Sequence, residues 1–335
     1  MKLFARVAFV LFTGVSTMYL SNAHGARERR PHLAPGSECR QMRPLASQAV
    51  DGTLYDCPAR PGSAPYYLHV PAGNTEGAPV IVVVHGISRN ALQHVRAFGS
   101  QAARQGFVTI APRFSRQAFP GYQRLGRCGA GGTSIPQAAL EEILGEAHAA
   151  TGADTSSVFM SGFSGGAQFA HRFALCTPGR VRGLVLASAG WYTFPDTLEP
   201  FPRGVGTAPL AQGLDVARLL QVPTLVVVGD QDTRRDGAFN ASGALDLQQG
   251  RTRVERGRNW VDAMQKAADR AGEGPHFSFG TMPGCGHNFR QCATQGGLVP
   301  RALEFFVRNM RRALPPDERA RPRPAHLMFS AATAG

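Results

Sequence analysis

The sequence predicts an α/β fold in which one mostly parallel sheet is covered by helices on both faces, and two patterns support this prediction. Short apolar runs rich in β-branched residues recur along the chain, as at 80–84 and 224–228. A strand that is apolar at every position is buried on both of its faces. Stretches with helical periodicity separate these runs, and this alternation is typical of a parallel sheet.

The expected elements follow one another over a single domain, 47–314, with no internal repeat and no linker. Residues 53–55 and 66–70 come without a helix between them, so we expect them to form an antiparallel edge of the sheet. The other expected strands are 80–84, 107–110, 158–160, 181–186, 224–228 and a weaker run at 276–279. The expected helices are 90–105, 135–150, 166–176, 254–272 and 298–313.

Residues 1–23 have the layout of a secretory signal peptide. Lys2 and Arg6 precede an apolar run, and the small residues Ser21 and Ala23 then offer a cleavage site. The run is shorter than the about 20 apolar residues that a membrane-spanning helix needs. We therefore predict a secreted or periplasmic protein with no stable membrane anchor.

Arginine dominates the charge of the chain, which is +13 overall, because Lys occurs only at positions 2 and 266. The Arg residues are scattered and no nucleic-acid-binding motif accompanies them, so we expect no nucleic acid partner. Residues 24–46, rich in Arg, Pro and His, predict a flexible leader, and residues 315–335, with repeated Arg-Pro, predict a disordered tail. The oligomeric state stays open.

The chain has six cysteines, and an even number in an exported protein predicts disulfide bonds. Cys285 and Cys292 lie close together in the sequence on either side of His287, and we predict that they pair and hold this loop still. These three residues could instead ligate zinc, but we expect no metal site because His287 suits a different role. The remaining cysteines would pair as Cys39 with Cys57 and Cys128 with Cys176.

Chemically reactive side chains follow several of the expected strands. In a parallel sheet the carboxyl ends of the strands lie along one edge, where sites form. The strand 158–160 leads into Gly162-Phe-Ser-Gly-Gly166, which matches G-x-S-x-G. This motif makes a tight strand-to-helix turn that lifts a serine hydroxyl clear of the sheet. We therefore predict that Ser164 is a nucleophile.

A serine nucleophile needs a base that accepts its proton and an acid that orients the base. In the chain order serine, acid, histidine, the candidates for the base are His276, His287 and His326. His276 begins the last expected strand and His326 lies in the tail. We predict His287, which follows that strand in a Gly-flanked loop.

The strand 224–228 leads into Gly229-Asp-Gln-Asp232, which offers two acids. We predict Asp232, because it lies further into the loop and is better able to reach the histidine loop. Asp230 is the second candidate, with a turn cap as its other interpretation, and Asp236 is a remote third.

Backbone amides must stabilise the oxyanion that forms in acyl transfer. Gly165 follows the nucleophile and is predicted to supply one of these amides. Ile87, in the loop after the strand 80–84, is predicted to supply the other. We interpret His85, which begins this loop, as a structural residue.

Taken together, these motifs resemble the α/β-hydrolase superfamily. The residues that carry the resemblance are Val82-Val-Val-His-Gly86, the turn at 162–166, Gly229-x-x-Asp232 and Gly286-His287. The stretches 162–172 and 189–195 make the chain more closely similar to secreted esterases, including polyhydroxybutyrate-depolymerase-like and feruloyl-esterase-like proteins. The resemblance covers about residues 50 to 313 and implies a single α/β-hydrolase domain that hydrolyses esters without a cofactor.

Trp191, Tyr192 and Phe194 follow the expected strand 181–186, and the segment 195–221 then carries Pro, Gly and Leu. One interpretation is a small cap over the substrate pocket, with the three aromatic side chains lining the pocket. The other is that the aromatic side chains pack within the core. The sequence does not choose between the two.

The sequence therefore predicts a secreted serine hydrolase that cleaves a small-molecule or oligomeric carboxylic ester through an acyl-enzyme intermediate. A serine peptidase of the same fold is one alternative, but such peptidases usually carry a larger cap or propeller domain, for which this chain has no room. A non-catalytic binding member of the fold is another. Such a protein would be expected to lose a residue of the Ser-Asp-His set, and none is missing.

Overall fold

The computed structural model describes residues 42–45, 51–61, 63–126, 134–207 and 213–312. The predicted signal peptide, most of the predicted leader and the predicted tail lie outside these residues. So do Cys39 and Cys128, and with them the disulfide bonds predicted for these two cysteines. No helix in the described segments combines the length and the apolar character needed to cross a bilayer.

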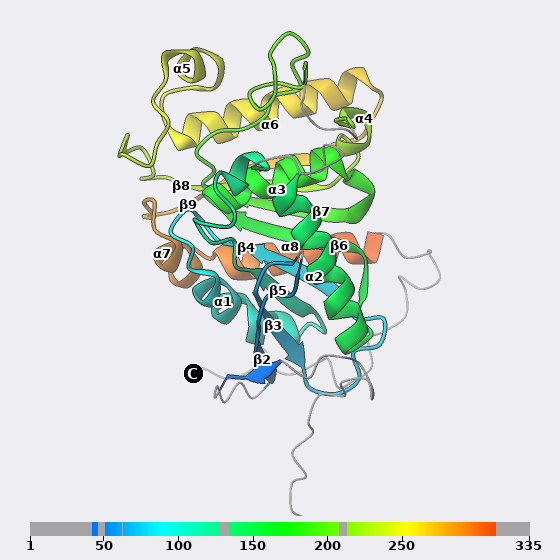
Figure 1. The fold of residues 1–335 in the computed structure, drawn as a ribbon. Coiled ribbons are helices and arrows are strands. Elements are labelled where there is room, and N and C mark those ends of the chain that lie inside the picture. The colour runs from blue at the N-terminus through cyan, green and yellow to red at the C-terminus, as the bar shows by residue number, and fades with distance from the viewer. Residues whose placement is uncertain (1–41, 46–50, 62, 127–133, 208–212, 313–335) are drawn as a thin grey trace, which may run out of the picture.

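A single nine-stranded sheet runs through the molecule (Figure 1). Its strand order is β1-β2-β3-β5-β4-β6-β7-β8-β9, antiparallel from β1 to β5 and parallel from β5 to β9. The strands are β1 (Arg43–Pro44), β2 (Gly52–Cys57), β3 (Tyr66–Pro71), β4 (Pro79–Val84), β5 (Val108–Pro112), β6 (Asp154–Phe163), β7 (Val181–Ala187), β8 (Thr224–Gly229) and β9 (Phe277–Met282). The mostly parallel sheet and its antiparallel edge are confirmed.

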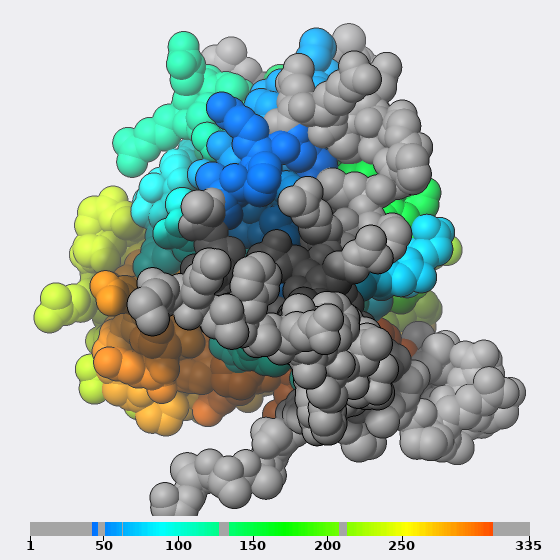
Figure 2. Space-filling view, turned by 90° about the horizontal axis from the view of Figure 1, so that it is seen from below, coloured from blue at the N-terminus to red at the C-terminus, as the bar shows by residue number. Residues whose placement is uncertain are grey.

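The sheet begins earlier than predicted, within the segment expected to be a flexible leader. Arg43 lies opposite Asp56 and Pro44 opposite Tyr55 in the pairing of β1 with β2, and the Leu45 amide donates to the Leu54 carbonyl. Both side chains of β1 are exposed, so the strand itself pairs through main-chain hydrogen bonds, while Met42 and Leu45 on either side of it pack against the core. Such pairing leaves no hydrophobic pattern in the sequence. Figure 2 shows this edge, in blue, from below.

Helices cover both faces of the sheet, as predicted (Figure 1). One face carries α1 (Ala91–Ala103), α7 (Phe289–Thr294) and α8 (Leu298–Arg312). The other carries α2 (Ile135–Thr151), α3 (Gly165–Cys176) and α6 (Arg253–Arg270). The short helices α4 (Val216–Leu219) and α5 (Gly243–Gln249) lie in the connections on either side of β8.

Successive residues of β4 face the two helical layers in turn. Val82 and Val84 pack in the cluster that includes side chains of α2, α3 and α6, whereas Ile81 and Val83 pack in the cluster that includes α1 and α8. All four side chains are fully buried. Because side chains alternate along a strand, a strand between two helical layers is apolar at every position.

The start of α3 lies against the backbone of β4. A Cβ atom on Gly166 would lie 2.0 Å from the Val84 carbonyl oxygen, and one on Gly162 would lie 2.3 Å from the backbone of Gly166. Only glycine allows such an approach. The contact places the turn before α3 beside the loop that follows β4, at the carboxyl edge of the sheet.

Gly166→Ala should therefore lower the free energy of unfolding by about 3 kcal/mol, since the clash is with backbone atoms that cannot rotate away. The matched control is Gly145→Ala, at an exposed position within α2 where an added Cβ meets no atom within 4 Å. That change should raise the free energy by about 0.5–1 kcal/mol, the gain in helix propensity. Urea denaturation followed by circular dichroism measures both. Equal effects of the two substitutions would contradict the close approach.

Candidate active site

Ser164 occupies the sharp turn between β6 and α3. Its φ and ψ angles are 55° and −114°, a conformation that costs a residue with a side chain free energy. The Ser164 amide is held by the Ala187 carbonyl at the end of β7, at 2.8 Å. The strain is thus maintained by the sheet, and it directs the hydroxyl toward the loops that follow β8 and β9.

The structure brings the predicted residues Ser164, His287 and Asp232 together in one chain of hydrogen bonds. His287 Nε2 lies 3.0 Å from Ser164 Oγ, and His287 Nδ1 lies 2.7 Å from Asp232 Oδ2. A neutral imidazole that is protonated at Nδ1 donates to the carboxylate and accepts from the hydroxyl. The arrangement can therefore move a proton from the serine hydroxyl to the histidine.

The two candidate acids lie in different surroundings. Asp232 is buried and contacts the histidine, whereas Asp230 is exposed. The Gln231 amide donates to the Cys285 carbonyl at 3.0 Å, which joins the acid loop to the histidine loop. The second oxygen of Asp232 accepts from Arg253 at 3.1 Å. Sequence reasoning missed Arg253, which is the first residue of α6 and has no local pattern that links it to the acid.

The amides predicted to bind the oxyanion lie close together. A Cβ atom on Gly165 would lie 3.4 Å from the Ile87 nitrogen and 2.9 Å from the Ile87 side chain. The Ile87 amide donates to no acceptor among the described residues. It is therefore available to a ligand oxygen beside Ser164.

His85 fixes the direction of the Ile87 amide. The Gly86 carbonyl accepts from His85 Nδ1 at 2.8 Å and from the Arg89 amide at 3.0 Å. Because the C=O and N–H of one planar peptide point in opposite directions, these bonds turn the Ile87 N–H away from His85. His85 Nε2 accepts from the Phe114 amide at 3.1 Å, and burial lowers the pKa of His85 to about 4. The ring is thus neutral and structural, as predicted.

A cavity of about 370 Å³ opens in front of Ser164 and His287. Its lining mixes apolar side chains with uncharged polar ones and one arginine, and no acidic residue contributes. The lining residues are Gly86, Ile87, Ser88, Asn90, Gln93, Phe163, Ser164, Ala238, His287, Asn288, Phe289 and Arg290.

The aromatic side chains that could have lined a pocket under a small cap do not line this cavity. Trp191 packs under Arg172, whose guanidinium carbon lies 4.2 Å from the ring centroid. Tyr192 is fully buried and stacks on Trp260 with 5.0 Å between centroids, and Phe194 belongs to the core. None of the described residues of the segment, 195–207 and 213–221, lines the cavity either. Burial against α3 and α6 keeps the aromatic side chains in the core.

Aromatic rings that the sequence did not single out support the histidine instead. Phe163, the residue before the nucleophile, stacks on His287 with ring centroids 5.2 Å apart. Phe289 packs edge-on against Phe163, and His94 of α1 stacks on Phe289 with centroids 3.5 Å apart. Phe163 is the variable position of G-x-S-x-G, so only its place next to Ser164 could have identified it.

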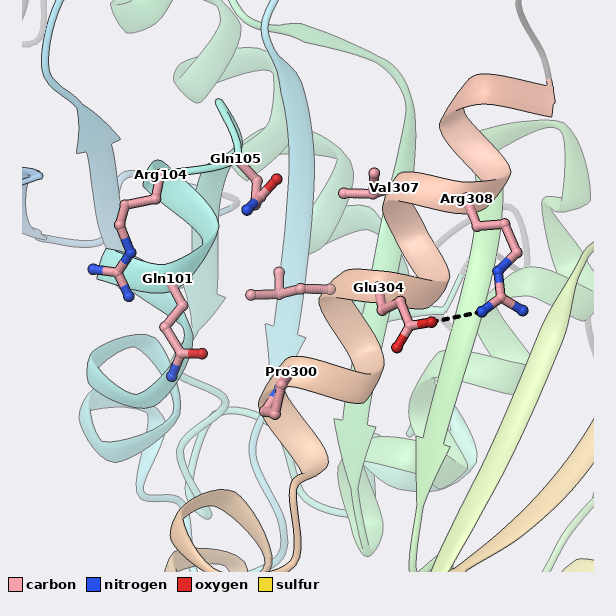
Figure 3. A pocket seen from close by; sticks show the side chains of 8 residues that line it. Gln101, Arg104, Gln105, Pro300, Glu304, Val307 and Arg308 are labelled. Atoms are coloured by element: carbon pink, nitrogen blue, oxygen red, sulfur yellow. Dashed lines mark hydrogen bonds and ion pairs between the residues drawn. The ribbon is translucent and has the colours of Figure 1, made fainter. Parts of the chain in front are cut away.

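A larger cavity of about 610 Å³ lies between α1 and α8, away from Ser164 (Figure 3). Gln101 of α1 and Arg104, the residue after α1, approach it from one side, and Glu304, Val307 and Arg308 approach it from α8. Glu304 and Arg308 pair with each other at 2.8 Å. The described residues that line this cavity include no serine, cysteine or histidine, and its acid, Glu304, is paired with Arg308, so it has no counterpart of the Ser164 site.

Cys285 and Cys292 are present as free, buried thiols. Burial raises the pKa of Cys292 to about 12, and the neighbouring Cys285 thiol adds to this shift. The Cys292 thiol donates to the Gly286 carbonyl at 3.7 Å, so it lies against the backbone next to His287. Within the described segments, no group of His, Cys, Asp and Glu side chains is arranged to hold a metal ion.

The chain is similar to known hydrolases over much of its length. Residues 65–246 match the dienelactone hydrolase family. LpqC, a poly(3-hydroxybutyrate) depolymerase from Bordetella parapertussis, is 28% identical, with a TM-score of 0.62 over 81% of this chain and 92% of that chain. No curated protein matches the sequence.

Two further solved structures share the fold at lower identity. Poly(aspartic acid) hydrolase-1 from Sphingomonas sp. KT-1 is 23% identical, with a TM-score of 0.62 over 82% of this chain and 98% of that chain. An S-formylglutathione hydrolase from Agrobacterium tumefaciens is 14% identical, with a TM-score of 0.52 over 79% of this chain and 97% of that chain. Both similarities support the α/β-hydrolase fold.

The buried histidines predict how stability depends on pH. Burial lowers the pKa of His69 and His85 to about 4, and it lowers the pKa of His94 and His171 well below the usual value. The unfolded chain, with histidine pKa values near 6.5, binds protons that the native state does not, so stability falls as the pH falls through this window. His69→Leu should reduce the stability lost between pH 7 and pH 5 by about 2 kcal/mol. Urea denaturation at the two pH values measures this loss, and an unchanged loss would contradict the prediction.

Proposed function

We propose that this chain, which belongs to the dienelactone hydrolase family, is an exported serine hydrolase that cleaves carboxylic esters through an acyl-enzyme intermediate. Ser164 is the nucleophile, His287 the general base and acid, and Asp232 the residue that orients His287. One observation carries the proposal. The hydrogen-bonded chain of these three residues ends at a serine hydroxyl that opens into a cavity, beside the Ile87 amide, which donates to no acceptor among the described residues.

The proposed reaction has two halves. In the first, His287 takes the Ser164 proton while Oγ attacks the ester carbonyl carbon, and the amides of Ile87 and Gly165 bind the oxyanion. The alcohol leaves with the proton from His287, and the acyl group remains on Ser164. In the second half, His287 takes a proton from water, the resulting attack forms a second oxyanion, and the acid leaves as Ser164 regains its proton.

The relative at 28% identity supports ester cleavage over peptide cleavage. LpqC is described as a depolymerase of poly(3-hydroxybutyrate), which is a polyester. We infer that this chain acts on small or oligomeric esters, including esters of hydroxy acids. The cavity of about 370 Å³ is large enough for part of such a chain.

Export is part of the proposal and rests on the basic, apolar and small-residue layout of residues 1–23. In an oxidising compartment the adjacent thiols of Cys285 and Cys292 can form a disulfide. That bond would tie the loop carrying His287 to α7. It would keep the base near the serine during turnover.

Ser164→Ala should lower kcat for p-nitrophenyl esters by about 10³-fold or more, because the nucleophile is lost. Asp232→Asn should cost a comparable factor, since the histidine loses the acceptor that fixes its tautomer. Asp230→Asn is the matched control, and because that side chain is exposed, its kcat should stay within about threefold of wild type. A fluorophosphonate probe should label wild type and not Ser164→Ala. Labelling that survives this substitution would show that the nucleophile lies elsewhere.

A panel of esters and peptides decides the substrate class. We expect turnover of p-nitrophenyl esters, hydroxyalkanoate oligomers or feruloyl esters, and no turnover of peptides. Peptide cleavage that depends on Ser164 would favour a peptidase. No turnover of any substrate by a correctly folded wild-type chain would favour a binding protein.

The exported protein should contain a disulfide between Cys285 and Cys292. Closing so short a loop should raise the free energy of unfolding by about 2–3 kcal/mol relative to the reduced protein. Peptide mapping without reduction should recover the two cysteines in one linked pair. Alkylation of both thiols before any reductant is added would refute the bond.

A further inference from the structure

The carboxylate that orients His287 has a second, charged partner. The side chain of Asp232 is fully buried, and while one oxygen contacts His287 the other accepts from Arg253 Nη1 at 3.1 Å. Burying a carboxylate carries a desolvation penalty of several kcal/mol unless a cation and hydrogen bonds offset it. Neutral His287 supplies only a hydrogen bond. Arg253 supplies the compensating charge.

Arg253 is held rigidly, with only 1% of its side chain exposed. Its Nη1 also donates to the Arg234 carbonyl at 3.2 Å, and its guanidinium carbon lies 5.0 Å from the centroid of Phe239. Its Nη2 reaches Asp236 at 3.5 Å. The Nε–H has no partner in the described part of the chain. The guanidinium therefore faces the loop that carries Asp232 and Asp236, although its Nε–H makes no hydrogen bond there.

The position of Arg253 does not serve the helix that carries it. It is the first residue of α6, after the N-cap Thr252 and before Glu255, whose carboxylate completes a capping box. Positive charge at a helix N-terminus is disfavoured by the helix dipole, which prefers acids there. Contact with Asp232 offsets this cost.

The charges around His287 change during the proposed reaction. In the resting site, Asp232 and Arg253 form a neutral pair beside a neutral imidazole. When His287 takes the Ser164 proton, an imidazolium forms next to that pair. Asp232 stabilises the new cation, and Arg253 opposes it. A site with Asp232 alone would hold a proton on His287 more strongly.

We propose that Arg253 is a positioning residue that fixes the ionised carboxylate of Asp232 and keeps His287 unprotonated, and therefore active as a base, at lower pH than Asp232 alone would allow. This inference rests on the proposed function of Ser164, His287 and Asp232.

Other groups near His287 determine the sign of the expected effect. The loop after β8 contributes Asp236, about half-exposed, whose carboxylate also interacts with His287. Burial raises the pKa of Tyr192, and it raises that of Cys292 in α7 to about 12, so both groups stay neutral over the working range. Arg290 in α7 is exposed.

Without the positive charge of Arg253, the negative charges of Asp232 and Asp236 act more strongly on His287. They then favour its protonated form, the imidazolium. The acid limb of the pH–rate profile should then move to higher pH.

The test compares a neutral and a charged replacement at the same position. Arg253→Gln keeps a hydrogen-bond donor near Asp232 and removes the positive charge. Arg253→Lys keeps the positive charge and loses the planar set of N–H donors of the guanidinium. We expect Arg253→Gln to move the acid limb of kcat/KM to higher pH by about one unit. We expect Arg253→Lys to lower kcat while leaving the limb within about 0.3 unit of wild type. Arg253→Met provides a second neutral variant if Arg253→Gln does not fold by circular dichroism.

Arg235→Met is the matched control, because Arg235 also packs on Phe239, at 5.3 Å, but pairs with Asp246 instead of Asp232. Its acid limb should not move. An unmoved limb in the neutral variants, or an equal shift in Arg253→Lys or Arg235→Met, would overturn the role of Arg253. Failure of the proposed function would look different from failure of the role of Arg253. Wild type would then show no Ser164-dependent activity, so no pH–rate profile could be measured.

Discussion

The close approach of α3 to the strands β4 and β6 is the constraint on which the site depends. Neither Gly162 nor Gly166 leaves room for a Cβ atom, so the helix begins directly on the ends of two neighbouring strands. That contact produces the positive φ of Ser164 and places the first amides of α3 beside Ile87. The parallel order from β6 to β9 then brings the acid and histidine loops to the same edge. The positions of the site residues therefore follow from how the strands and α3 meet at the carboxyl edge of the sheet.

Features that depend on local pattern were predictable from the sequence. A strand such as β4, buried on both faces, must be apolar throughout, and this leaves a strong signal. The turn around Ser164 has a local glycine signature, and parallel strands bring their carboxyl ends together. For this reason Ser164, Asp232 and His287 could be expected to meet. Their chemical roles stay predictions.

Features that depend on distant partners were not predictable. Trp191 and Tyr192 follow a strand end and are aromatic, which suits a pocket and a core equally. Arg172 and Trp260, remote in sequence, decide in favour of the core. Arg253 is the first residue of α6, and nothing near it in the sequence points to Asp232. Both side chains of the strand β1 are exposed, so they leave no apolar pattern in the sequence.

The two hydrogen bonds to the Gly86 carbonyl affect the activation barrier of the proposed reaction. In water, solvent dipoles must reorient around a developing oxyanion, and this reorganisation adds to the barrier at every turnover. A peptide already clamped by His85 and the Arg89 amide has no such rotation left to make. The free energy needed to orient this peptide is expended during folding and not at each turnover. The rate would then depend on an imidazole that never touches the substrate and never changes its charge.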